Sequence, residues 1–289
     1  MDTRAILMGL AFALMWASAF SSARIIVADA PPMGALAIRF LISGLIGVTL
    51  ARYLGQSWRL DASQWRATVL FGLCQNALYL GLNFVAMQTV EASLAAIIAS
   101  AMPLLVALAS WAAFGERLGV SALLGLIAGL SGVVLIMGSR VEGGADPFGI
   151  VLCCIGVLSL TFATLALRTA SSGGNYLMIV GLQMLIGALP LAVLSLLTET
   201  LAFEPSWQLT AAFIYTIFVP GLAATFVWFL LVNRIGATRA ATYHFLTPFF
   251  GVSIAAAVLG ESVGPLDILG VLIITLGILL VQRARIQNA

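Results

Sequence analysis

The chain has 289 residues, of which 62% are hydrophobic and only 8% are charged, and its formal net charge is +2. Because a water-soluble domain carries about 25% charged residues, this composition excludes a soluble protein and predicts a membrane protein. The mean hydropathy of +1.13 agrees with that interpretation. The three cysteines, Cys74, Cys153 and Cys154, lie inside apolar runs and offer neither a disulfide framework nor the spacing of a metal site.

Ten apolar runs are each long enough to cross a hydrocarbon core, which takes about 20 helical residues. Short connections join them, so the sequence predicts an all-α bundle of ten transmembrane helices without a soluble domain. The first run continues past Ala17-Ser18-Ala19, which resembles a signal-peptide cleavage site, and we interpret it as a retained span. The predicted spans are 5–27, 33–54, 64–87, 91–114, 119–138, 147–167, 175–198, 207–232, 237–259 and 265–282.

A stretch of 44 residues occurs twice, at 92–135 and, 145 residues later, at 237–280. Without gaps, 12 of the 44 positions are identical, including Pro103 with Pro248 and the turn Gly115-Glu116 with Gly260-Glu261. Each half then holds five helices, an odd number, so the second half is expected to cross the membrane in the opposite direction. The prediction is two inverted repeats, 1–140 and 141–289.

Arginine placement predicts the orientation, since loops on the cytoplasmic side carry an excess of basic residues. With a cytoplasmic N-terminus, ten arginines fall inside and only Arg24 and Arg140 fall outside. This bias predicts that both termini are cytoplasmic. The ten inside residues are Arg4, Arg52, Arg59, Arg66, Arg117, Arg168, Arg234, Arg239, Arg283 and Arg285.

The small-residue run 92–96, followed by Pro103 and by Gly115-Glu116-Arg117, resembles the EamA repeat. The opening Met15-Trp16-Ala17-Ser18-Ala19-Phe20 is similar to that family's Trp-Gly-x-x-Phe motif, although Ala17 replaces the glycine. The chain thus resembles the ten-helix EamA family of the drug/metabolite transporter superfamily, and within it the aromatic amino-acid exporters of bacterial inner membranes. This resemblance implies a basket of helices 1–4 and 6–9 around a central cavity, with helices 5 and 10 outside it. It also implies export of amino acids or related metabolites by alternating access.

The third span carries the clearest polar stripe, formed by Asn76, Tyr79 and Asn83, with Gln75 beside it. Spacings of three and four place those three side chains on one helix face. A polar face inside the bilayer must look toward protein or water. Hydrogen bonding to a substrate is one interpretation, and bonds between helices, worth about 0.6 kcal/mol each, are the other. We favour the cavity for Tyr79.

Aromatic residues also lie far from the helix ends, where interfacial belts do not explain Trp16 or Trp228. Together they predict a cavity that accepts an apolar or aromatic side chain, with lipid packing as the alternative. His244, the sole histidine, is expected to bind substrate or a proton, or to be a neutral residue bound to a neighbouring helix. The predicted cavity residues are Trp16, Asn76, Tyr79, Asn83, Ser100, Phe162, Trp228, Tyr243 and His244.

Arg39 lies about two turns into the second span. We expect it to reach the outer interface or to pair with an acid such as Glu91, and we favour this over a contact with a substrate carboxylate. Pro103 and Pro248 are predicted as matched kinks or hinges. Glycines in the fifth and tenth spans have a small-residue spacing suited to close helix contacts, namely Gly125, Gly129, Gly132, Gly270 and Gly277.

The leading functional prediction is an amino-acid exporter of the bacterial inner membrane that works by facilitated diffusion, since Asp and Glu are absent from every span centre. The alternative is a carrier or proton antiporter for another small metabolite or a drug-like compound. An enzyme is not expected, because the sequence offers no catalytic triad, carboxylate pair or metal cluster. We expect no cofactor, no metal and no nucleic-acid partner. The expected partners are the transported small molecule and membrane lipid. The protein is expected to be a monomer, with a dimer as the alternative.

Overall fold

The computed structural model describes residues 3–115, 119–166, 174–235, 240 and 242–287. Within these ranges every element of regular secondary structure is a helix, joined to the next by short connections. Nine of the described helices are long and apolar enough to cross a membrane, and a shorter apolar helix covers Tyr243–Leu259. The chain is therefore a multi-pass, all-helical protein, as its composition predicts. Four residues used in the sequence argument, Glu116, Arg117, Arg168 and Arg239, lie outside the described residues.

In the first half of the chain, two of the five spans depart from a single continuous α-helix. The third contains a π-helical segment, and the fourth is interrupted at Ala101. The elements are α1 (Thr3–Asp29), α2 (Pro32–Tyr53), α3 (Ala62–Phe71), η1 (Gly72–Leu80), α4 (Gly81–Ala86), α5 (Ala92–Ser100), α6 (Met102–Phe114) and α7 (Val120–Glu142).

The second half has a similar series of elements, including a π-helix in its third span. The elements are α8 (Pro147–Ala166), α9 (Tyr176–Thr198), α10 (Trp207–Thr216), η2 (Ile217–Ala223), α11 (Ala224–Ile235), η3 (Thr242–Leu246), α13 (Thr247–Leu259) and α14 (Pro265–Gln287). One prediction is corrected here. A continuous helix was expected over 237–259, but a 3-10 turn, η3, precedes α13 and holds His244.

Several helix ends recur 145 residues apart. The bounds of α13 follow those of α6 by this distance, and so do the bounds of α14 and α7. The π-helices η1 and η2 also begin 145 residues apart. After α6 and α13 the chain turns through Gly115 and Gly260, whose φ angles are 65° and 69°. Only glycine adopts this left-handed conformation without strain, which explains the glycine in both Gly-Glu turns.

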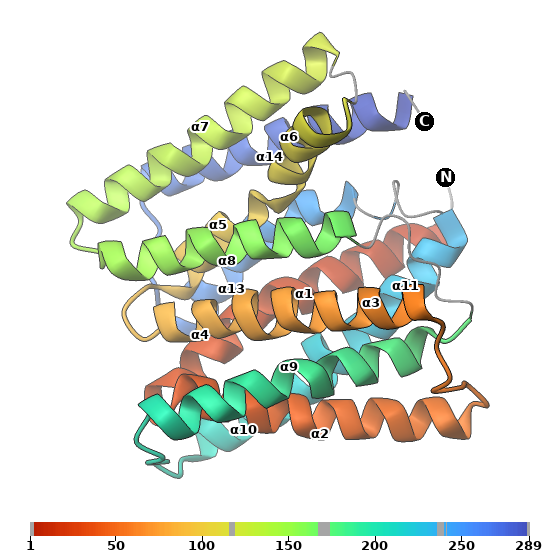
Figure 1. The fold of residues 1–289 in the computed structure, drawn as a ribbon. Helices are drawn as coiled ribbons and strands as arrows, with labels where there is room; N and C mark the ends of the chain where they lie inside the picture. Colours follow the sequence, from red (N-terminus) through yellow and green to blue (C-terminus); the bar gives the residue numbers. More distant parts are fainter. Residues whose placement is uncertain (1–2, 116–118, 167–173, 236–239, 241, 288–289) are drawn as a thin grey trace.

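Helices α7 and α14 lie side by side along one edge of the bundle (Figure 1), and glycines bring their backbones together. A Cβ atom on Gly277 would lie 2.6 Å from the carbonyl oxygen of Gly125, and one on Gly132 would lie 3.1 Å from that of Gly270. The close helix packing predicted for these glycines is confirmed, and the structure shows that α7 and α14 are each other's partners. In lipid, where apolar side chains gain little by leaving the solvent, such close packing is a main source of helix association.

Helices α2 and α9 form the other extensive contact between the halves. Gly44 and Gly181 permit it, since a Cβ atom on Gly181 would lie 2.7 Å from the backbone nitrogen of Val48. Between these two helix pairs, α5 is buried along its whole length. Both termini lie at the same end of the bundle (Figure 1), which we call the terminal end, and the opposite end is the distal end.

The glycine contact predicts a selective loss of stability. Gly125→Ala should lower stability by about 1–3 kcal/mol, because the added methyl group meets the α14 backbone. Gly138→Ala in the same helix is the control, since no atom lies within 4 Å of a Cβ atom there. Thermal unfolding of both variants in detergent measures the difference, and equal unfolding temperatures would contradict this explanation of the α7–α14 contact.

Candidate functional site

A small enclosed pocket of about 60 Å³ lies inside the bundle, between the two halves. The first half contributes α1, α2, η1 and α4, and the second half contributes α9, η2 and α11. Its volume admits a few water molecules or one small functional group. The lining residues are Trp16, Ala19, Phe20, Ala23, Arg39, Phe40, Gln75, Asn76, Tyr79, Leu80, Asn83, Phe84, Met87, Met184, Pro220, Gly221 and Thr225.

The predicted polar stripe lies on this pocket, with Asn76, Tyr79 and Asn83 all buried. The Asn76 Nδ2 atom donates to the Gln183 carbonyl oxygen on α9 at 2.9 Å, a bond between helices. The Asn83 Nδ2 atom donates to the Tyr79 carbonyl oxygen at 2.8 Å, but its Oδ1 atom has no hydrogen-bond partner. Asn76 thus has a structural contact, whereas Asn83 holds a free acceptor at the pocket.

Two π-helices border the pocket, η1 with Asn76 and Tyr79 and η2 with Pro220 and Gly221. A π-helical turn is wider than an α-helical turn and occurs frequently at functional sites. In η2, Pro220 removes one backbone donor, and Gly221 leaves space where a side chain would otherwise stand. The helices are thus irregular at the depth of the pocket, which the hydrophobic pattern did not predict.

Arg39 on α2 corrects the sequence prediction. It is 5% exposed and lines the pocket, and Glu91 pairs with Arg140 instead. Its guanidinium carbon lies 5.2 Å from the centre of the Phe40 ring. Such a cation–π contact contributes about 0.5–2 kcal/mol, whereas burying an ion costs several kcal/mol. No carboxylate of the described residues forms an ion pair with Arg39.

Four rings form an aromatic cluster on the terminal side of the pocket: Phe12, Trp16, Trp228 and His244. The His244 ring centre lies 5.3 Å from that of Phe12, 5.9 Å from Trp16 and 5.4 Å from Trp228. Of the four, only Trp16 lines the pocket. Phe12 lies one turn of α1 nearer the terminal end than Trp16, so the cluster extends from the pocket toward that end.

Tyr243 packs beside this cluster, against α1. A Cβ atom on Gly9 would lie 2.2 Å from the Tyr243 ring, so the absence of a side chain at Gly9 permits the contact. Tyr243 is part of the packing at the terminal side and does not line the pocket.

The structure does not bring Ser100 or Phe162 to the pocket. The Ser100 hydroxyl donates to the Ile97 carbonyl oxygen at 2.6 Å inside α5. Phe162 on α8 is 57% exposed on the outer surface of the bundle. Pro103 and Pro248 each stand second in a helix, after the interruption at Ala101 and after η3 respectively. Both prolines thus begin a new α-helix, and their role as kinks or hinges stays a prediction.

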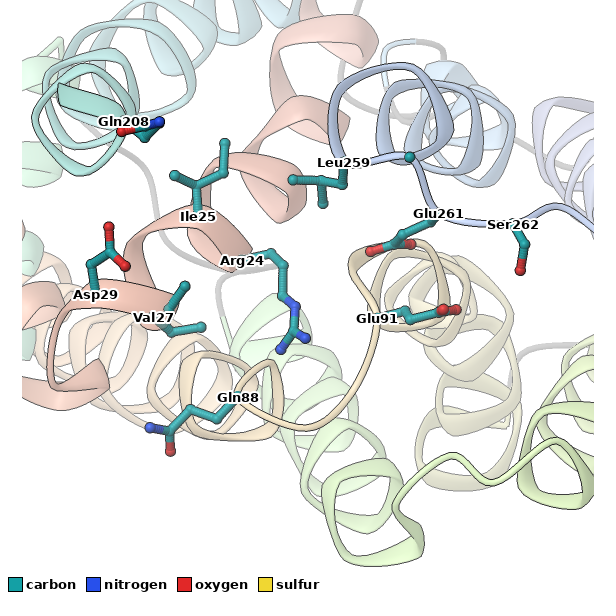
Figure 2. Close-up of a pocket in the computed structure, with 12 residues that line it drawn as sticks. Arg24, Ile25, Val27, Asp29, Gln88, Glu91, Gln208, Leu259, Glu261 and Ser262 are labelled. Carbon is teal, nitrogen blue, oxygen red and sulfur yellow. The ribbon is translucent and has the colours of Figure 1, made fainter. Parts of the chain in front are cut away.

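A vestibule of about 840 Å³ opens at the distal end, beyond the pocket (Figure 2). Arg24 separates the two spaces, because its Nη1 atom donates to the Met87 carbonyl oxygen. Ala23 and Met87 line the pocket, while the adjacent Arg24 and Gln88 line the vestibule. The contact between Arg24 and Met87 therefore lies in the partition between pocket and vestibule.

Acidic residues line the vestibule and tie its helices together. The Glu261 carboxylate accepts from the backbone nitrogens of Ala92 at 2.7 Å and Ser93 at 2.9 Å, which caps the N-terminus of α5. Glu91 pairs with Arg140, which also binds Asp267 at 2.8 Å. Partial burial, with further contributions from Glu261 and Asp267, raises the pKa of Glu91 despite the neighbouring Arg140.

The described residues hold no group of three or more His, Cys, Asp or Glu residues that could bind a metal ion. The site is instead a mostly apolar pocket with a few polar groups, surrounded by helices long enough to span a membrane, next to a charged vestibule. This arrangement is that of a membrane transport protein.

The sequence model of the EamA-like transporter family matches this chain twice, over residues 3–138 and 147–283. The chain belongs to the EamA-like transporter family.

Individual relatives agree with this assignment. The uncharacterized transporter YvbV of Bacillus subtilis is 28% identical over 99% of this chain and 94% of its own length. The uncharacterized inner membrane transporter YedA of Escherichia coli K12 is 26% identical over 96% of this chain and 91% of its own length. A protein of known crystal structure has the same fold, with a TM-score of 0.70 and 20% identity over all of both chains.

The cap on α5 predicts a measurable contribution to stability. Glu261→Ala should cost about 0.5–2 kcal/mol, because two backbone N–H groups lose their acceptor. Glu142→Ala is the control: Glu142 is exposed at the C-terminus of α7, where a negative charge is unfavourable. Chemical or thermal unfolding in detergent should show a loss for the first variant only. A loss of equal size in both would contradict the role of Glu261 as a cap.

Proposed function

We propose that this transporter exports amino acids, neutral or aromatic ones in particular, across a bacterial inner membrane. Substrate passes through the central pocket by alternating access of two inverted repeats, 1–140 and 141–289, and moves by facilitated diffusion. The family membership supports a transporter, and the subtype of aromatic amino-acid exporter is the finer step that we add.

The observation that carries this proposal is the pocket that both halves line. Carriers built from two repeats bind substrate at the interface of the repeats near the middle of the membrane. Here that interface offers amide and phenol groups from Asn76, Tyr79 and Asn83 together with the apolar rings of Trp16 and Phe20. Such a mixture suits a solute with a polar head and an apolar or aromatic side chain.

The conformation supports alternating access. The distal vestibule is wide, whereas at the terminal side the rings of the aromatic cluster contact one another and Tyr243 packs against Gly9 of α1. At about 60 Å³ the pocket is far smaller than the roughly 300–1,000 Å³ of ligand sites that hold drug-sized molecules. Binding of a whole amino acid therefore requires the pocket to widen, through movement of the partition at Arg24 and Met87.

The orientation belongs to the same proposal. The terminal end is placed in the cytoplasm and the vestibule outside, because the arginine bias favours a cytoplasmic terminal end. Among the described lining residues of the pocket there is no Asp, Glu or His to exchange a proton with the substrate. This supports facilitated diffusion over the alternative, a proton antiporter for another metabolite or a drug-like compound.

Reconstitution tests the proposal directly. Proteoliposomes should take up labelled phenylalanine, tryptophan or leucine down its gradient, and the rate should change less than about twofold when a pH gradient is imposed. Protein-free liposomes are the control. Absence of transport for every amino acid would refute the proposal, and a strong dependence on the pH gradient would favour the antiporter.

Variants locate the pathway. Trp16→Ala and Tyr79→Phe should reduce transport about tenfold or more, because each removes a group that lines the pocket. Phe162→Ala is the matched control, since it also removes an aromatic ring, but from the outer surface. Equal effects of Trp16→Ala and Phe162→Ala would place the pathway elsewhere.

A growth test extends the prediction to the aromatic cluster. Cells that express the protein should tolerate a toxic amino-acid analogue, and Trp228→Ala or His244→Ala should lose that tolerance.

A further inference from the structure

Arg39 is a buried cation to which the described protein offers no anion. Both ion pairs of the described residues involve Arg140. The Arg39 Nε atom is buried and has no hydrogen-bond partner. A charged side chain inside a membrane bundle is retained at a cost in stability, and it marks a ligand or transport site unless another role accounts for it. The neighbouring Phe40 ring contacts the guanidinium but accepts no conventional hydrogen bond from it.

Gly221 of η2 lies next to Arg39, and both residues line the pocket. A Cβ atom on Gly221 would lie 3.8 Å from Arg39 Nη2 and 2.9 Å from the Thr216 carbonyl oxygen, so a side chain there would contact the guanidinium and crowd the carbonyl. Glycine at this position thus leaves the guanidinium uncovered by a side chain from η2. Ser43, one turn further along α2, has a buried hydroxyl without a hydrogen-bond partner, but it is not among the described residues that line the pocket.

A second unsatisfied group belongs to the same pocket. The Asn83 Oδ1 atom is a buried acceptor without a partner. The residues that line the pocket therefore include a cationic donor, Arg39, and a neutral acceptor, Asn83. Since no Asp or Glu is found among its described lining residues, an anion is the ligand that neutralises it.

We propose that this pocket binds the carboxylate of a small organic acid, with the Arg39 guanidinium as the donor to that group. The planar guanidinium matches a carboxylate through two parallel hydrogen bonds. A donor elsewhere on the substrate, such as the amino group of an amino acid, binds Asn83 Oδ1 and is not required. This inference rests on the proposed transport function and narrows its substrates to compounds with a free carboxylate. The volume of about 60 Å³ holds this head group as the structure stands.

Ligand-induced stabilisation of the full-length protein in detergent tests this inference. We expect 3-phenylpropanoate and L-phenylalanine to raise the unfolding temperature, and L-phenylalaninamide, which lacks the carboxylate, to leave it unchanged. Sodium chloride and sodium phosphate at the same ionic strength separate the organic acid from a simple anion. An equal rise with either salt, or with the amide, would overturn the proposal.

Variants of Arg39 separate binding from structure. Arg39→Met removes an unpaired buried charge, so the unfolding temperature without ligand should stay equal or rise. The half-saturating concentration of 3-phenylpropanoate should increase at least tenfold. Arg52→Met, at the exposed end of the same helix, should match the wild type in both measurements. A lower unfolding temperature with unchanged binding would make Arg39 structural and overturn the proposal.

Two further measurements keep the outcomes distinct. Should Arg39→Met fail to fold, Arg39→Lys retains the cation without the planar fork and should bind the acid several-fold more weakly, and wild-type affinity would count against the proposal. In proteoliposomes, wild-type transport of both L-phenylalanine and its amide, with Arg39→Met equally active, would overturn the carboxylate contact and leave the transport function standing. Carboxylate binding without transport of any amino acid would instead contradict the proposed transport function and leave the carboxylate site standing.

Discussion

Inside a bilayer every backbone N–H and C=O group must find its partner within the protein, and this requirement governs the whole molecule. It explains why the described chain is helical, and it makes the helix ends costly. Two such ends are satisfied across the halves. Glu199 accepts from the backbone nitrogens of Met33 and Gly34, each at 2.9 Å, and Glu261 accepts from those of Ala92 and Ser93. The second half thus completes the start of α2 and of α5.

The same requirement limits where the helices can be irregular. The π-helices η1 and η2 border the internal pocket, and the interruption at Ala101 falls at the end of the buried helix α5. In these places, neighbouring protein or enclosed water can satisfy a backbone group that lipid would leave unpaired. Irregularity and the pocket therefore occur together, and the glycine contacts of α7 with α14 and of α2 with α9 hold the regular helices around them.

The sequence predicted the features that depend on composition and spacing. Apolar length placed nine of the ten predicted spans to within about five residues, and spacing placed Asn76, Tyr79 and Asn83 on one face. It failed where the direction of a side chain decides the outcome. Phe162 and Trp16 are both aromatic residues deep in a span, yet one is exposed and the other lines the pocket. For Arg39, depth along α2 suggested the interface, and only the packing of α2 against η2 and α9 shows that it is buried. The sequence did contain one signal of this burial: Arg39 lies two turns inside a span, and no acidic residue lies at a matching depth in another span.

The caps from Glu199 and Glu261 also constrain how the chain acquires its structure. Ribosomes deliver the first half to the membrane before either glutamate has been made. The backbone N–H groups at the N-termini of α2 and α5 therefore lack these carboxylate acceptors at first. Water at the membrane surface can serve these groups only while the helix ends stay at the surface. The start of α2 can reach its final position only after Glu199, at the end of α9, has been made. The start of α5 can do so only after Glu261, in the turn after α13, has been made. Maturation of the bundle is therefore late and is set by the last third of translation.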